Sequence, residues 1–162
     1  MQGKIIEYDG KYQEQIINLI LKIQNDEYNI GLSIKEQDDL LNIENEYVLK
    51  GGNFWICVDS DDKIIGTIAL FKISADVAVL KKFFVDSRFR GSDYGVGANL
   101  FDTLLSFVKS RGFKHIILDT PAVATRSHNF YRKVGFRLIE KVDLPVEYSY
   151  PDRNSFIFIL DI

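Results

Sequence analysis

The sequence predicts a mixed α/β fold in which one β-sheet carries helices packed on its faces. The first half of the chain places helical periodicity before a series of short apolar runs, which is typical of an antiparallel meander. The second half alternates strand-like and helix-like segments, and such alternation buries a sheet between helices. A length of 162 residues is the size of one domain, so we expect residues 1–162 to form a single domain.

The first segments predict a strand followed by two helices. Residues 4–8 form a short strand, and residues 12–24 repeat isoleucine and leucine at helical spacing. Ser33 begins a second helix, because Glu36 lies three residues later in the pattern of a capping box. The apolar face of that second helix would consist of Leu40, Leu41 and Ile43.

Three strands follow in series. Residues 54–58 are apolar and rich in strand formers, a polar turn occupies residues 59–62, and residues 63–73 resume the strand pattern. This arrangement predicts a β-hairpin. Residues 77–85 would then be the third strand of the antiparallel meander.

The second half predicts helices and strands in alternation. Residues 96–111 and 122–134 have helical spacing, and each segment is followed by a glycine, which commonly ends a helix. Strands are predicted between and after these helices, at residues 114–119, 136–142 and 155–162.

Composition and charge exclude several classes of protein. The chain is 46% hydrophobic and 27% charged, which excludes intrinsic disorder, and its net charge of -3 argues against a nucleic-acid or membrane-surface partner. With Cys57 as the one cysteine, no internal disulfide can form, and two histidines make a dedicated zinc site unexpected. No apolar run approaches the ~20 residues that span a bilayer, and the N-terminus lacks a signal-peptide pattern. We therefore expect a cytoplasmic protein without a metal, and leave homodimer formation open.

The most informative segment is the glycine-containing loop at residues 85–98, which leaves a predicted strand and enters a predicted helix. Its glycines let backbone N–H groups approach a ligand, because no Cβ stands in the way. The first turn of a helix also leaves N–H groups unpaired and carries a partial positive charge. Since Arg88 and Arg90 add positive charge, the loop predicts a site for a phosphate or pyrophosphate.

Two nucleotide-binding motifs can be compared with this loop. A P-loop requires a Gly-Lys-Ser/Thr ending that the loop lacks. A dinucleotide fingerprint fits in part: Gly95 and Gly97 supply its first two glycines, but Leu100 replaces the third. Asp119 ends the next strand, about where a ribose-binding acid would fall. The antiparallel half before the loop does not suit a dinucleotide-binding fold. From the loop alone, two interpretations stay open: a phosphate-binding site, or a tight turn between strand and helix with no ligand.

A second motif lies downstream, and the two motifs together indicate a family. In chain order, the matching residues are Val85, Arg90-Gly91, Gly95-Val96-Gly97, Phe130-Tyr131 and Gly135-Phe136. With these motifs the chain resembles the GNAT superfamily of acyl-CoA-dependent N-acetyltransferases, most strongly over residues 80–136. The resemblance implies a largely antiparallel sheet of about seven strands, with a central parallel pair and helices on both faces.

The resemblance also implies acetyl-CoA as cosubstrate and a role for each motif. Its pyrophosphate would be held by the loop and the following helix, at Arg90, Gly91, Ser92, Gly95, Val96, Gly97 and Ala98. The strand edge at Phe83 and Val85 would pair with the pantetheine arm, where two parallel strands splay apart. Tyr131 matches the family's general acid, which protonates the departing thiolate. Asn129 would be a further contact to CoA.

Departures from the family pattern leave the base unassigned. Residues 92–94 lengthen the glycine loop by about two residues relative to the family motif, which carries a single residue at that point. The strand before the loop lacks the glutamate that many relatives use as a base through water. The alternatives are Glu27, Asp119 or Glu147 acting through water, or no protein base at all.

The resemblance therefore predicts transfer of an acetyl group from acetyl-CoA to a primary amine, by direct attack through a tetrahedral intermediate. The alternative is a catalytically weak CoA-binding or sensor module of the same fold, as the missing strand glutamate suggests. The acceptor would be a small molecule or an exposed amino group, held by residues 26–39 and 143–154. A cationic acceptor would suit the acids in these segments, which are Asp26, Glu27, Glu147 and Asp152.

Overall fold

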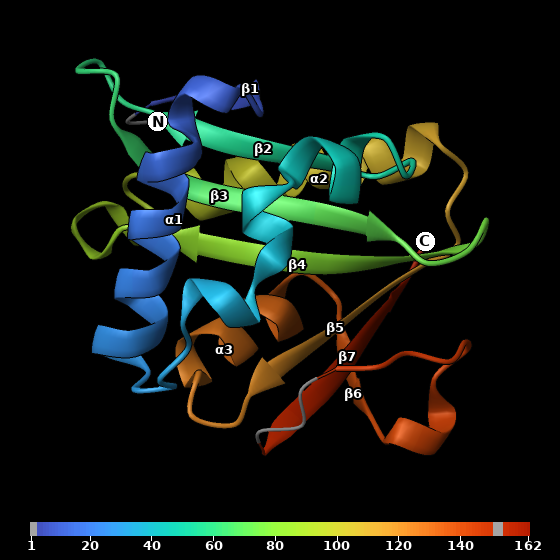
Figure 1. The fold of residues 1–162 in the computed structure, drawn as a ribbon. Coiled ribbons are helices and arrows are strands. Elements are labelled where there is room, and N and C mark those ends of the chain that lie inside the picture. Colours follow the sequence, from blue (N-terminus) through green and yellow to red (C-terminus); the bar gives the residue numbers. More distant parts are fainter. Residues whose placement is uncertain (1–2, 151–153) are drawn as a thin grey trace.

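A mixed β-sheet runs through the molecule, and helices cover both of its faces (Figure 1). The computed structural model describes residues 3–150 and 154–162. Within these residues the sheet has seven strands in the order β1-β2-β3-β4-β5-β7-β6, and β4–β5 is its one parallel pair. This topology confirms the predicted fold class. The strands are β1 (Lys4–Glu7), β2 (Asn53–Val58), β3 (Ile64–Lys72), β4 (Val77–Val85), β5 (His115–Pro121), β6 (Arg137–Ile139) and β7 (Ser155–Asp161).

The helices divide between the two faces. α1 (Gln13–Lys22) lies in front of the sheet in Figure 1, and α2 (Val96–Ser110) lies behind it. Alternate residues of β2 show the same division. Phe54 and Ile56 pack into the core under α1, whereas Trp55 and Cys57 pack into the core under α2. Helix α3 (Thr125–Lys133) contributes Tyr131 to the α2 core, so α2 and α3 share a face.

The two parallel strands pair for only part of their length. β4 and β5 are in register from Val77 opposite His115 to Val79 opposite Ile117, and no pairing continues beyond that point. β5 stays paired with β7 to its end at Pro121. The second halves of β4 and β5 therefore separate within the sheet, as the family resemblance implied.

A β-bulge reshapes β4 just where the strands separate. Thr67 faces Phe84 and Ala69 faces Lys81, so β4 has one more residue than β3 between these pairs. Lys82 lies in the bulge and has φ 52°. This left-handed backbone conformation costs a residue other than glycine about 1 kcal/mol. The buried hydroxyl of Thr67 donates a 2.6 Å hydrogen bond to the carbonyl oxygen of Lys82. This bond ties the bulge of β4 to β3.

The helix predicted from Ser33 is wrong. Two short 3₁₀ turns, Ile34–Glu36 and Asp38–Leu41, take its place, and Ser33 makes no side-chain cap to the backbone. Gln37, between the turns, is buried and exchanges two side-chain hydrogen bonds with Gln24. A continuous helix does not form, because Gln37 is buried against Gln24, which lies 13 residues earlier on a different element.

Other boundaries shift by a few residues. α3 starts at Thr125 rather than residue 122, because the N–H of Ala122 donates to the carbonyl of Asn154 before the helix begins. β6 spans three residues instead of residues 136–142, since the chain leaves the sheet and forms a 3₁₀ turn at Lys141–Asp143.

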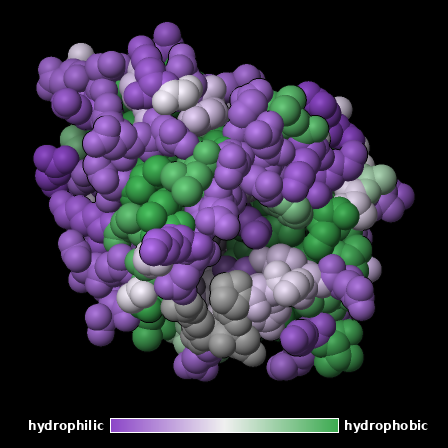
Figure 2. Space-filling view, viewed as in Figure 1, coloured by the Kyte–Doolittle hydropathy of each residue, from purple (hydrophilic) through white to green (hydrophobic). Residues whose placement is uncertain are grey.

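The surface in the Figure 2 view is mainly hydrophilic, and apolar side chains gather there in smaller areas. None of the helices within the described ranges is both long enough and apolar enough to span a bilayer.

Candidate active site

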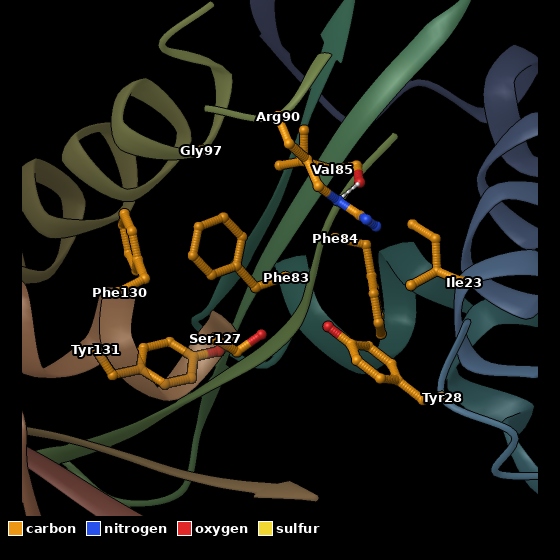
Figure 3. Close-up of a pocket in the computed structure, with 10 residues that line it drawn as sticks. All are labelled: Ile23, Tyr28, Phe83, Phe84, Val85, Arg90, Gly97, Ser127, Phe130 and Tyr131. Carbon is orange, nitrogen blue, oxygen red and sulfur yellow. Dashed lines mark hydrogen bonds between the residues drawn. The ribbon is translucent and has the colours of Figure 1, made fainter. Parts of the chain in front are cut away.

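Two adjoining cavities lie beside the free half of β4. The first, which we call the loop-side cavity, lies between the end of β4, the first turn of α2 and α3 (Figure 3). The turn after α1 forms its opposite wall through Ile23 and Tyr28. Predicted site residues that the structure brings together here are Phe83, Val85, Arg90, Gly97 and Tyr131.

The first turn of α2 presents backbone donors next to this cavity. Gly91 and Gly95 have φ of 104° and 68°, values that glycine adopts without the strain of a side chain, and Gly95 is the N-cap of α2. The N–H of Asn99 makes the first helical bond, to Gly95 O, so the N–H groups of Val96, Gly97 and Ala98 precede the helical ladder. The N–H of Gly95 itself donates to Gly91 O in the preceding turn.

The two arginines of the loop have different surroundings. Arg90 donates from Nε to the Val85 carbonyl at 2.9 Å and from Nη1 to Glu27 Oε1 at 2.6 Å, and it lines the loop-side cavity. Arg88 instead forms an ion pair with Asp86 at 2.9 Å, and this contact holds the pKa of Asp86 below its usual range. Arg90 is thus the loop arginine that reaches the cavity.

Some predicted cofactor contacts line neither cavity. Gly91, Ser92 and Ala98 are exposed beside the start of α2, and Asn129 is exposed on α3, outside both cavities. Their contacts with CoA stay predictions. Asp93, in the lengthened part of the loop, is also exposed.

The second cavity, which we call the strand-gap cavity, opens where β4 and β5 separate. Its volume is about 290 Å³. Residues Leu80–Phe84 of β4 and Asp119–Pro121 of β5 form its two sides, and the segment after α1 closes it with Gln37 and Asp39. Five residues line both cavities, which are Tyr28, Phe83, Phe84, Ser127 and Tyr131.

Tyr131 lies where the two cavities meet. It is 6% exposed, and its ring contacts Phe83, Phe136 and Phe158 at centroid separations of 5.5 to 6.4 Å. Burial is the main cause of a pKa raised well above that of a free tyrosine, so the hydroxyl keeps its proton at neutral pH. Such a phenol can donate a proton to a group formed beside it.

A hydrogen bond one turn before Tyr131 fixes α3 to β5. His128, one turn before, is buried and its Nε2 lies 2.9 Å from the carbonyl oxygen of Pro121 at the end of β5. Desolvation lowers the pKa of His128, which favours the neutral ring. His128 therefore ties α3 to β5 and has a structural role.

Sequence reasoning missed two hydroxyl-bearing residues. Ser127 precedes Tyr131 by four residues, so both lie on one face of α3, and this spacing was an available signal. Tyr28 lies within the segment expected to shape the acceptor pocket, but no motif distinguishes it. Figure 3 shows the hydroxyls of Ser127 and Tyr28 directed into the loop-side cavity from opposite walls.

The three candidate bases have different positions. Glu27 forms the ion pair with Arg90, and Arg126 lies 3.5 Å from the same oxygen. Glu147 is exposed on the loop after β6, away from Tyr131. Asp119 lines the strand-gap cavity together with Tyr131. Of the other predicted acceptor-side acids, Asp26 is exposed and Asp152 lies outside the described residues.

Lys82 is a further polar residue of the strand-gap cavity that sequence reasoning missed. Its ammonium donates to Gln37 Oε1 at 2.6 Å and lies 3.6 Å from Asp39 Oδ2. Burial is the main cause of its lowered pKa, which the nearby carboxylate of Asp39 partly offsets. The cavity therefore has charges of both signs. Within residues 3–150 and 154–162, no cluster of three metal-ligating side chains occurs.

Comparison with known proteins identifies the family. The model of the acetyltransferase (GNAT) family matches residues 17–136, which is most of the chain, and the chain belongs to this family. A solved acetyltransferase from Streptococcus agalactiae is 39% identical, with a TM-score of 0.96 over 100% of both chains. A GNAT-family acetyltransferase from Staphylococcus aureus is 34% identical, with a TM-score of 0.92 over 98% of both chains.

More distant proteins share the fold or part of the sequence. PaiA N-acetyltransferase from Thermoplasma acidophilum, solved in complex with coenzyme A, has a TM-score of 0.79 at 18% identity over 100% of both chains. N-acetylaspartate synthetase of Rattus norvegicus is 34% identical over 101 residues, 61% of this chain and 33% of that protein. Probable N-acetyltransferase camello of Xenopus tropicalis is 28% identical over 61% of this chain and 45% of that protein. The matched segments thus cover about a third of the length of N-acetylaspartate synthetase and less than half of the length of camello.

Proposed function

We propose that the protein transfers an acetyl group from acetyl-CoA to a primary amine. The observation that carries this proposal is the position of Tyr131, which lines both the loop-side cavity and the strand-gap cavity. A two-substrate transfer needs two sites that meet at one reacting carbon, with a proton donor beside it.

The residues of the loop-side cavity suit the long, polyanionic cosubstrate. The N–H groups of Val96, Gly97 and Ala98, which precede the first helical hydrogen bond, favour a pyrophosphate together with the helix dipole, and Arg90 supplies a cation. The edge of β4 at Phe83 and Val85 would pair with the amide groups of the pantetheine arm. The remaining contacts would come from Gly91, Ser92, Gly95 and Asn129.

The chemistry follows from the junction of the cavities. A neutral amine in the strand-gap cavity attacks the thioester carbon, and the C–N bond forms as the carbonyl becomes an oxyanion. The N–H of Val85, at the edge of β4, would donate to that oxyanion. The C–S bond then breaks, and Tyr131 protonates the thiolate. The proton left on nitrogen returns the tyrosine to its neutral form.

The acceptor class rests on the relatives and on the cavity. The names of the matched relatives, N-acetylaspartate synthetase and probable N-acetyltransferase, support an amine acceptor. The strand-gap cavity, at about 290 Å³, has room for a small molecule or the end of a side chain.

We propose a cytoplasmic enzyme that acts without a metal.

A second candidate is a CoA-binding or sensor module of the same fold with weak turnover. It is favoured by β4, where residues 79–82 carry no acid. Thiol release from acetyl-CoA, measured with a panel of primary amines, separates the two functions. Turnover with at least one amine supports the transferase, whereas binding without turnover on every amine supports the sensor. Acetyl-CoA should raise the melting temperature, and NAD and ATP should not.

A further inference from the structure

One buried acid in the strand-gap cavity has the position of a base. Asp119 lies on β5 two residues beyond Ile117, the last residue paired with β4. Its backbone stays in register with Ile157 of β7, so the sheet fixes its Cα while its side chain lines the cavity. Tyr131 lines the same cavity from α3.

The carboxylate of Asp119 is held in place by a phenol from a distant loop. Tyr148, buried in the loop after β6, donates its hydroxyl hydrogen to Asp119 Oδ1. An ionised carboxylate has about four acceptor positions, so this bond leaves room for an incoming ammonium group. Two other acids line this cavity. Glu36 is exposed, and Asp39 already accepts a 2.5 Å hydrogen bond from Tyr47 and lies 3.6 Å from Lys82.

The electrostatic surroundings of Asp119 suit a proton acceptor. Burial raises the pKa of Asp119, and three neighbours act against that rise. These are the Tyr148 hydrogen bond and the charges of Lys81 and Lys82 on β4. The net shift is upward, so the carboxylate is more basic than a free aspartate and still surrounded by groups that permit its ionisation.

We propose that Asp119 is the general base that deprotonates the acceptor ammonium, and that Tyr148 is the residue that positions it. The inference rests on the proposed acetyl transfer. The ammonium gives one proton to Asp119, which passes it to solvent, and the neutral amine attacks. The amide product keeps one of the three original protons, and the third balances the proton that Tyr131 gives to the thiolate.

The main test is Asp119→Asn, measured by thiol release against pH with an amine that the wild type acetylates. Asparagine can still accept the Tyr148 hydrogen bond, so the fold should hold. We expect kcat/KM to fall by about 10²-fold at pH 7, and we expect the acidic limb to move from the pKa of Asp119 up to the pKa of the amine itself. The deficit should shrink toward pH ~10, where the amine becomes neutral without a base. A structural role would produce a deficit that does not change with pH.

Two further variants complete the test. Tyr148→Phe removes a hydrogen bond that lowers the pKa of Asp119, so the acidic limb should move to higher pH with a smaller loss of kcat. Glu140→Gln, which changes an exposed acid at the start of the 3₁₀ turn Lys141–Asp143, should leave the profile unchanged. Wild-type kinetics in Asp119→Asn, or an unmoved limb in Tyr148→Phe, would overturn the inference while the transferase stands. A wild-type protein inactive on every amine would instead overturn the proposed function.

Discussion

Arg90 Nη1 lies 2.6 Å from Glu27 Oε1, and this ion pair joins the glycine loop to the π turn Ile23–Glu27 that follows α1. Both side chains are largely withdrawn from water, with exposures of 18% and 26%. The same guanidinium is the cation proposed to meet the CoA pyrophosphate. Glu27 and the cosubstrate would therefore compete for Arg90.

We predict that Glu27→Gln tightens acetyl-CoA binding by about 2- to 10-fold, which corresponds to at most ~1.4 kcal/mol. The variant removes a carboxylate that competes for Arg90 and that repels a polyanion. Titration calorimetry with acetyl-CoA measures the change, and Glu46→Gln, which breaks a surface pair with Lys50, is the control. Weaker binding would instead show that Glu27 holds Arg90 in its binding position.

Tyr131→Phe should lower kcat by about 10²-fold and leave the dissociation constant of acetyl-CoA within twofold. The ring keeps its contacts with Phe83, Phe136 and Phe158, so only the proton donor is lost. Thiol release and calorimetry measure the two quantities. Equal losses of turnover and affinity would assign Tyr131 a packing role.

Gly97→Ala should weaken acetyl-CoA binding by about tenfold without lowering the melting temperature. An added Cβ would meet Val85 Cγ2 at 3.7 Å and Phe83 Cζ at 3.8 Å, which are ordinary contacts, and alanine suits a helix better than glycine. The new methyl would, however, narrow the wall of the loop-side cavity. Unchanged affinity would show that the cosubstrate does not approach the backbone here.

Gly95→Ala should have the opposite effect on stability from Gly97→Ala. Gly95 has φ 68°, so any side chain there is strained, and an added Cβ would lie 3.1 Å from Asn99 Nδ2. We expect this variant to lose about 1–2 kcal/mol of unfolding free energy, measured by urea denaturation.

Thr67→Val should cost about 1–3 kcal/mol of unfolding free energy, because the carbonyl oxygen of Lys82 loses its hydroxyl donor in a buried place. The bulge that places Phe83 would relax, so kcat should fall as well. Thr67→Ser keeps the donor and is the control, with activity close to wild type. Denaturation and thiol-release measurements would contradict the argument if both variants behaved alike.

The order of strands and helices could be predicted because it depends on local patterns. The strand at residues 77–85 matches β4 in full, and the helix predicted to begin at residue 96 begins there, since a glycine N-cap precedes an apolar repeat. The helix predicted from Ser33 failed because its capping pattern is local, whereas the burial of Gln37 depends on Gln24 and Lys82 from other elements.

The sequence by itself determined the family, the glycine loop and the Phe130-Tyr131 motif, because each is a matter of residue type at short spacing. Only the tertiary structure decided which of three acids shares a cavity with Tyr131, and which arginine reaches the loop-side cavity. Asp119 and Tyr148 are 29 residues apart, and Arg90 and Glu27 are 63 apart. Such contacts form when the sheet brings distant segments together, so they cannot be predicted from residue spacing along the chain.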